Sequence, residues 1–302
     1  MDAARDRFTL EIVEAEDLKL LECVDTYGYT CHGHECGIQV FPSSYRLENL
    51  LRAHFFAKAS HTSSCDVVGE DDLRSRGKKG SVARELETGP GLSPSSLQLV
   101  DTRAIVNGQV MQDGTQSKGG SRTIASSGET RQRPVSRRPA NSIRPICRAF
   151  MEFPYDRHLP LHIDGIQTST YQMVFKRLRS EGIEVLPRQR IFYAELAWQQ
   201  AYEATEGLVV PLNAGEWHEK RLTPYCIVVQ RTRWSQTART RLDNELEIAR
   251  RENMAAKKTK DARRTYAFFI GTQNPENLSH FVVSDQRLIC TVHGKLIFPK
   301  QQ

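Results

Sequence analysis

Two pairs of metal-binding residue types lie close together near the start of the chain. Cys31 and Cys36 are separated by four residues, His61 and Cys65 by three residues, and the two pairs by 24 residues. Thiolate and imidazole are the usual ligands of structural zinc sites, in which four of them close a tetrahedron around one ion. Gly37 follows the second cysteine and permits the sharp turn that such a cysteine pair needs. The spacing predicts a structural Zn²⁺ site formed by the three cysteines and His61.

Neighbouring histidines leave the identity of the fourth ligand undecided. His32, His34 and His54 lie in the same segment, and His54 is an alternative fourth ligand. We favour His61 because an H-x3-C spacing holds both ligands within one local turn. The competing interpretation is that no metal binds and that these are unrelated polar residues.

The composition changes twice along the 302 residues. Residues 66–141 contain no aromatic side chain and are rich in glycine, serine, arginine and proline. Such a segment cannot bury enough apolar surface to offset the entropy of ordering. We therefore predict an α+β protein in three parts: a zinc-stapled N-terminal unit at 1–68, a disordered linker at 69–141 and an α+β domain at 142–302. The first unit has a thin core, and Zn²⁺ would add on the order of 10 kcal/mol to its stability.

Periodicity predicts the main elements. Residues 46–59, 168–182 and 236–263 have apolar residues at helical spacing. β-Branched and aromatic residues are dense in five later segments, which we expect to be strands: 207–212, 223–234, 264–271, 280–285 and 287–298. Strands interrupted by one helix also occur in OB-fold barrels, so an OB-like barrel is the more specific expectation for the C-terminal domain.

The charge balance permits an anionic partner. Lys and Arg number 42 against 36 Asp and Glu, a net charge of +6. OB-fold surfaces bind single strands by stacking bases on aromatic rings beside basic residues. The candidate contacts are Tyr193, Arg231, Arg233 and Trp234 in the C-terminal domain, with Arg137 and Arg138 at the arginine-rich end of the linker. The alternative is that the rings belong to the core and the arginines are simply solvated.

The Cys/His pattern resembles one known protein segment. Its matching residues are Cys31, Cys36, His54, Phe55, His61 and Cys65. They are similar to the N-terminal zinc-finger-like segment of CoiA-type competence proteins and related bacterial proteins of unknown function, over about 35–45 residues. CoiA-type proteins continue into a restriction-nuclease-like domain, whereas this chain continues into the predicted linker, and 142–302 contain no D-(x)n-E-x-K pattern. The resemblance therefore implies the metal site and a bacterial setting such as DNA uptake, mobile elements or defence.

Sequence signals for catalysis are weak. The chain contains no G-x-x-x-x-G-K-[ST], no G-x-G-x-x-G and no G-x-S-x-G, which disfavours nucleotide hydrolysis and dinucleotide redox chemistry. A metal-dependent nuclease would have to use Asp156, His158, His162 and Asp164. Prolines at 154 and 160 break any helix there, so a structural turn is the favoured interpretation.

These observations favour a non-catalytic, zinc-containing DNA-binding module. The first alternative is a protein adaptor that grips a partner subunit through the zinc unit or the charged helix, and the second is a divergent metal-dependent nuclease. No run approaches the roughly 20 apolar residues of a membrane span, and the N-terminus lacks the apolar core of a signal peptide. We expect a cytoplasmic protein with reduced thiols, in which Cys147, Cys226 and Cys290 are buried in the core.

Overall fold

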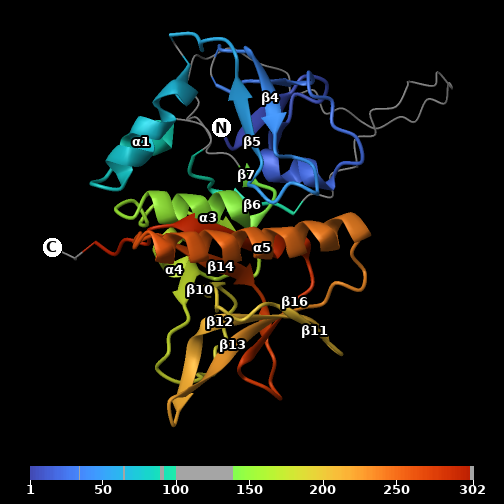
Figure 1. The fold of residues 1–302 in the computed structure, drawn as a ribbon. Helices are drawn as coiled ribbons and strands as arrows, with labels where there is room; N and C mark the ends of the chain where they lie inside the picture. The colour runs from blue at the N-terminus through green and yellow to red at the C-terminus, as the bar shows by residue number, and fades with distance from the viewer. Residues whose placement is uncertain (34, 64, 89–91, 100–138, 300–302) are drawn as a thin grey trace, which may run out of the picture.

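The computed structural model describes residues 1–33, 35–63, 65–88, 92–99 and 139–299. Its architecture is mixed α+β with four sheets. Figure 1 shows helices α3 (Ile143–Glu152) and α5 (Gln236–Lys258) across the middle of the molecule, with the N-terminal sheet on one side and the β12–β13 hairpin on the other. Both helices therefore contact more than one part of the chain.

The N-terminal unit is built on an antiparallel five-stranded sheet. Its elements are β1 (Ala3–Asp6), β2 (Ile12–Glu14), η1 (Ala15–Leu20), β3 (Tyr29–Thr30), β4 (Gln39–Ser43), β5 (His54–Ala57) and η2 (Asp66–Gly69), with strand order β2-β1-β3-β4-β5. One sheet face is buried through Tyr29, Val40 and Phe55, against Leu18 of η1. The helix predicted at 46–59 is wrong, because residues 54–57 pair with β4 instead.

Part of the predicted linker is folded. Residues beyond 69 form α1 (Glu70–Gly77), α2 (Ala83–Thr88) and β6 (Ser96–Leu97), and β6 pairs with β7 (Pro139–Ala140) and β8 (His162–Ile163). Val82, Leu86 and Leu97 are buried in the core around α3. The prediction of disorder is therefore wrong for the described residues 69–88 and 92–99, because a few aliphatic side chains suffice where a large core already exists. The rest of that prediction, 100–138 with Arg137 and Arg138, lies outside the described residues.

The C-terminal part contains two sheets. Its elements are α4 (Tyr171–Val174), β9 (Phe175–Arg177), β10 (Ile191–Glu195), β11 (Tyr202–Ala204), β12 (Gly207–His218), β13 (Arg221–Val229), α5, β14 (Arg264–Ile270), β15 (Thr272–Gln273), β16 (His280–Val283), η3 (Gln286–Leu288) and β17 (Ile289–Gly294). The strand orders are β17-β14-β10-β9 and β11-β12-β13-β16-β15. The five predicted strand segments and the long helix are confirmed, whereas 168–182 form only one helical turn before β9.

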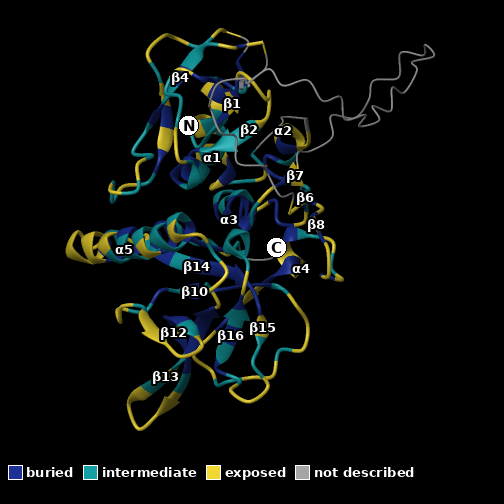
Figure 2. Cartoon of the chain, turned by 90° about the vertical axis from the view of Figure 1, so that its right-hand side faces the viewer, coloured by how far each residue is buried: buried dark blue, intermediate teal, exposed yellow. Residues whose placement is uncertain are grey.

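No closed barrel forms among the described strands, so the OB-like expectation is corrected. The sheet β17-β14-β10-β9 is buried on both faces. Tyr193 and Phe268 pack with α3, whereas Phe192 and Phe269 pack with the second sheet and α5. A sheet covered on both sides is the middle layer of a stack of layers. Figure 2 shows its strands β10 and β14 as mostly buried.

Helix α5 begins with a conventional cap and packs along one face. The Ser235 hydroxyl accepts a hydrogen bond from the Ala238 amide at 3.2 Å, which satisfies a free donor of the first turn. Leu242 and Ala249 are buried against the sheets. Within the part of the chain that the structure describes, no helix is long and apolar enough to span a membrane.

A buried charge pair joins α3, α5 and β17. The Arg144 guanidinium donates to the Glu245 carboxylate at 2.5 Å, and Glu245 also accepts the Thr291 amide at 2.5 Å. Burial alone would raise the pKa of Glu245, but Arg144, Arg241 and Arg52 lower that pKa to about 2. Glu245 is therefore an anion that the folded protein requires.

Replacing Glu245→Gln should lower the free energy of unfolding by about 3 kcal/mol, because Arg144 would be left as a buried charge without a counter-ion. The measurement is urea unfolding followed by tryptophan fluorescence. Glu247→Gln, two residues away in the same helix and paired with Arg250 near the surface, is the matched control and should change the value by less than about 1 kcal/mol. Equal effects of both substitutions would contradict this account of the pair.

The difference between wild type and Glu245→Gln should depend on pH. The folded pKa of Glu245 is about 2, below the value of about 4.3 for an unfolded glutamate. The carboxylate therefore stabilises the fold fully above pH 4.3, and its contribution is lost as the pH falls toward 2. Urea titrations of both proteins at several pH values should show their stabilities converging over this window. A difference that stays constant down to pH 2 would contradict the assignment.

Candidate metal centre

The three cysteines and His61 form one compact cluster. Their ligand atoms all lie within 4.8 Å of one another. The Sγ atoms of Cys31 and Cys65 are 3.7 Å apart, and His61 Nδ1 is 3.4 Å from the Sγ of both Cys36 and Cys65. Tetrahedral zinc with ordinary bond lengths requires about 3.8 Å between two sulfurs and about 3.6 Å between sulfur and nitrogen. The cluster therefore has the size of a Cys3His zinc site and could hold such an ion.

The first cysteine pair lies at the tip of the β3–β4 hairpin. The Cys31 amide donates to the Ile38 carbonyl at 2.8 Å, which closes the hairpin, and the Cys36 amide donates to the Gly33 carbonyl at 3.3 Å. Gly37 has a φ of 55°, in the left-handed region that glycine adopts without strain. The Gly33 amide also donates to Cys31 Sγ at 3.4 Å, an arrangement that supports a thiolate. The turn predicted from Gly37 is confirmed.

The second pair follows β5 and leads into η2. Cys65 directly precedes η2, and its carbonyl accepts the Val68 amide at 3.3 Å. Its own amide donates to the Thr62 carbonyl at 3.1 Å, so a tight turn sets the spacing between His61 and Cys65. The four side chains thus come from two separate loops, and a shared ion would tie these loops together.

The other histidines of the segment are placed differently. His54 is exposed on β5, and its Nδ1 lies 3.4 Å from the Arg52 carbonyl, away from the sulfur atoms. His32 contacts the Ala3 carbonyl and Glu70. His34 lies outside the described residues. The clustered histidine is therefore His61, as the H-x3-C spacing favours.

The surroundings of the thiols differ from one cysteine to the next. Burial raises the pKa of Cys31 to about 12. Burial acts in the same direction on Cys36, but hydrogen bonds from the Ile38 and Thr62 amides and from Cys65 and His61 lower its pKa to about 6. A divalent cation would stabilise all three thiolates at once and displace their protons. Four protein ligands would also complete the coordination sphere and leave no position for a substrate, which is the arrangement of structural sites.

Among the described residues, those predicted to contact nucleic acid are not all at the surface. Tyr193 is only 3% exposed and stacks on Phe268 inside the core, so its assignment to base stacking is wrong. The Trp234 indole donates to the Ser284 carbonyl at 2.6 Å and packs partly against the core. Arg233 is exposed. The sequence shows Tyr193 beside basic and aromatic residues, but it does not show that α3 covers this face of β10.

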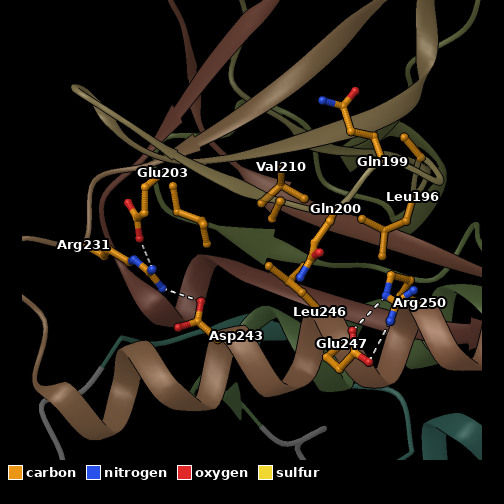
Figure 3. A pocket seen from close by; sticks show the side chains of 13 residues that line it. Leu196, Gln199, Gln200, Glu203, Val210, Arg231, Asp243, Leu246, Glu247 and Arg250 are labelled. Carbon is orange, nitrogen blue, oxygen red and sulfur yellow. Dashed lines mark hydrogen bonds and ion pairs between the residues drawn. The ribbon is translucent and has the colours of Figure 1, made fainter.

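Arg231 lines a pocket of about 280 Å³ between α5 and the strands β11 and β12. Figure 3 shows its guanidinium between the carboxylates of Glu203 and Asp243, with Arg250 paired to Glu247 nearby. The pocket lining carries three acidic and two basic side chains. An approaching phosphate would meet a net negative charge and would have to displace two carboxylates from Arg231. The pocket therefore does not favour an anionic ligand.

The residues considered for a nuclease centre do not come together. Asp156 is buried and accepts hydrogen bonds from the Ser81 hydroxyl at 2.5 Å and the Val82 amide at 3.0 Å, at the start of α2. His162 and Asp164 form an exposed pair, and His158 is exposed elsewhere. The structural interpretation of this segment is thus confirmed for Asp156. Cys147, Cys226 and Cys290 are buried, as predicted.

Sequence reasoning missed one group of residues. Phe41 contacts both Tyr27 and Phe56, and these two outer rings are exposed to solvent. Phe41 and Phe56 are directly paired across β4 and β5. In the sequence, Phe41 and Phe56 are simply aromatic residues next to other apolar residues. The strand register is needed to show that they lie on the same face of the sheet.

Comparison with known proteins identifies no family. No protein-family model matches the chain, and neither curated proteins nor solved structures include a match. The similarity to CoiA-type proteins therefore stays a prediction that concerns the Cys/His pattern. What the structure supports is a zinc-binding unit near the N-terminus.

A pair of histidine variants tests the ligand set. His61→Ala should lower the zinc content of the purified protein from about one ion per chain to well below that, because three thiolates alone hold the ion less well. His54→Ala changes the same residue type seven positions earlier, and it should leave the zinc content unchanged. Elemental analysis of the three proteins gives the answer. Equal zinc in both variants would remove His61 from the site.

Proposed function

We propose that this chain is a non-catalytic, zinc-containing nucleic-acid-binding protein, in which a structural Cys3His centre holds the N-terminal unit in its folded form. The observation that carries the proposal is the convergence of four ligand atoms within 4.8 Å from two separate loops. A small sheet with a thin core usually needs such a staple. The closed ligand set supports a structural role for the ion, with no part in catalysis.

Nucleic acid is the partner that charge and pattern favour. The net charge of +6 and the similarity of the Cys/His segment to a competence-protein segment both point to it. The described residues bring no group of catalytic side chains together around an open metal position. DNA remains the proposed target, in a bacterial system such as DNA uptake, mobile-element maintenance or defence.

A protein adaptor is the second candidate. Helix α5 is largely occupied by contacts within the chain, because Asn244 and Glu252 bind the N-terminal unit while the opposite face packs on the sheets. The better surface for a partner subunit is the projecting β12–β13 hairpin, where Trp217 is 56% exposed. An exposed aromatic residue on a projecting hairpin is a common anchor at protein interfaces.

Removing zinc should unfold the N-terminal unit selectively. We expect a strong chelator to abolish the hydrogen-exchange protection of amides in β3, β4 and β5, whereas the amides of β14 and α5 keep theirs, because the latter have their own core. Cys65→Ser should reproduce this loss without chelator, and Cys23→Ser, which changes an exposed cysteine outside the cluster, should not. Unchanged protection of the β3–β5 amides after verified zinc removal would contradict a structural role for the ion.

A further inference from the structure

The outer face of the N-terminal sheet carries a defined set of side chains. The register pairs Arg5 with Thr30, Thr30 with Gln39, Phe41 with Phe56, and Ser43 with His54. Residues that are paired, or two apart on one strand, share a face. We call the part of this face on β3, β4 and β5, together with Arg5 of β1, the aromatic face. Its members are Arg5, Thr30, Gln39, Phe41, Ser43, His54 and Phe56, joined by Tyr27 and Lys58. The same face of the sheet continues onto β2 with Ile12 and Glu14. The opposite face is the buried one, with Tyr29, Val40 and Phe55.

Three aromatic rings lie in a row on this face. The ring centroids of Tyr27 and Phe41 are 5.7 Å apart, and those of Phe41 and Phe56 are also 5.7 Å apart. Tyr27 is 64% exposed and Phe56 is 41% exposed. Phe41 lies half-buried between these two exposed rings. The three rings together form a platform on which flat groups can stack.

The charges on the aromatic face are basic, although the unit as a whole is acidic. Residues 1–68 contain eleven acidic and six basic side chains. Several of the acids are turned toward the rest of the molecule, where Asp2 and Glu14 contact Arg148 and Asp17 contacts Arg241.

The aromatic face itself carries Arg5, His54 and Lys58. The Lys58 ammonium lies 4.5 Å from the Phe41 ring centroid. Asp25 is the acidic residue nearest in sequence to Tyr27, and its carboxylate accepts the Tyr27 amide at 2.9 Å. Arg5 and Lys58 thus place cations on the aromatic face, and the Asp25 carboxylate lies at its Tyr27 end.

We propose that the aromatic face binds single-stranded nucleic acid, with bases stacked on Phe41, Phe56 and Tyr27 and with phosphates near Arg5 and Lys58. This inference rests on the proposed function and names the surface that would perform it. Rings combined with cations are what single-strand-binding surfaces use, because every base has a face that can stack. Duplex DNA hides those faces, so it should bind more weakly. An exposed ammonium–ring contact is weak, and a base can replace Lys58 above Phe41.

The metal cluster adjoins the strands that carry the platform. Cys36 lies three residues before β4, and His61 lies four residues after β5. An ion shared between them would hold both strands at their ends on the same side of the sheet. Loss of zinc should therefore separate Phe41 from Phe56. It should weaken nucleic-acid binding even though the zinc ligands themselves do not contact the nucleic acid.

The test is fluorescence anisotropy with labelled thymidine and uridine oligomers of about 20 nucleotides, and a duplex of the same length, in about 50 mM and about 200 mM salt. The zinc-loaded full chain should bind at least one single strand more tightly than duplex. Phe56→Ala and Tyr27→Ala should each weaken that binding roughly 5- to 150-fold. Lys58→Ala should reduce the salt slope by about 0.7, the value for one phosphate contact. Tyr202→Ala changes an exposed aromatic residue on β11, outside the N-terminal unit, and should bind like wild type.

Three results would overturn the inference: no affinity for either single strand, a preference for duplex, or wild-type binding by both aromatic variants. The zinc content of every protein is measured alongside, so a misfolded variant is recognised, and Lys58→Ala provides a readout that does not disturb the sheet. A protein that contains zinc but binds no nucleic acid would refute the role proposed for the aromatic face. The zinc centre would stand, and the face would then be a candidate surface for a protein partner. Absence of zinc from the wild type would instead refute the proposed centre.

Discussion

A layer of buried charge is the contact on which the rest of the structure depends. Arginines of α3 and α5 meet carboxylates of the N-terminal unit there, as in the pairing of Arg148 with Asp2 and Glu14. In the opposite sense, Arg52 of the N-terminal unit donates to Glu252 of α5 at 2.7 Å. Buried ions are tolerated only when each has a partner, so the two parts fit in a single arrangement. The N-terminal unit is acidic, and its carboxylates pair with arginines of α3 and α5. These ion pairs fix how the N-terminal unit sits on the two helices.

The parts of the structure that sequence reasoning predicted are those determined locally. The metal cluster was predictable because each ligand pair is set by one turn, and its histidine followed from the same argument. Strands β12, β13, β14, β16 and β17 and helix α5 were predictable from dense or periodic apolar residues. The predictions failed where contacts with residues distant in the sequence determine the secondary structure. Residues 46–59 have helical spacing, yet pairing with β4 makes Phe55 a buried strand residue.

The same reason explains the misplaced nucleic-acid site. Tyr193 and Phe56 look alike in sequence, since each is an aromatic residue that directly follows a phenylalanine. What separates them is the number of layers on the sheet: α3 covers Tyr193, whereas no described element packs on Phe56. A sheet's second face is settled by the topology of the whole chain, which no short pattern contains. Base stacking beside basic residues was predicted for the C-terminal domain. In our proposal this mode of binding belongs to the N-terminal sheet instead.

One consequence of the pairing between β6 and β7 concerns how the chain can vary. Leu97 and Ala140 are register partners, and the Gln98 amide donates to the Ala140 carbonyl at 2.8 Å, so two positions far apart in the sequence lie side by side. The entropy of closing a loop grows only with the logarithm of its length, by about 0.6 kcal/mol for each doubling. A flexible insertion between these two strands would therefore cost little free energy, and it would leave both the metal cluster and the aromatic face intact.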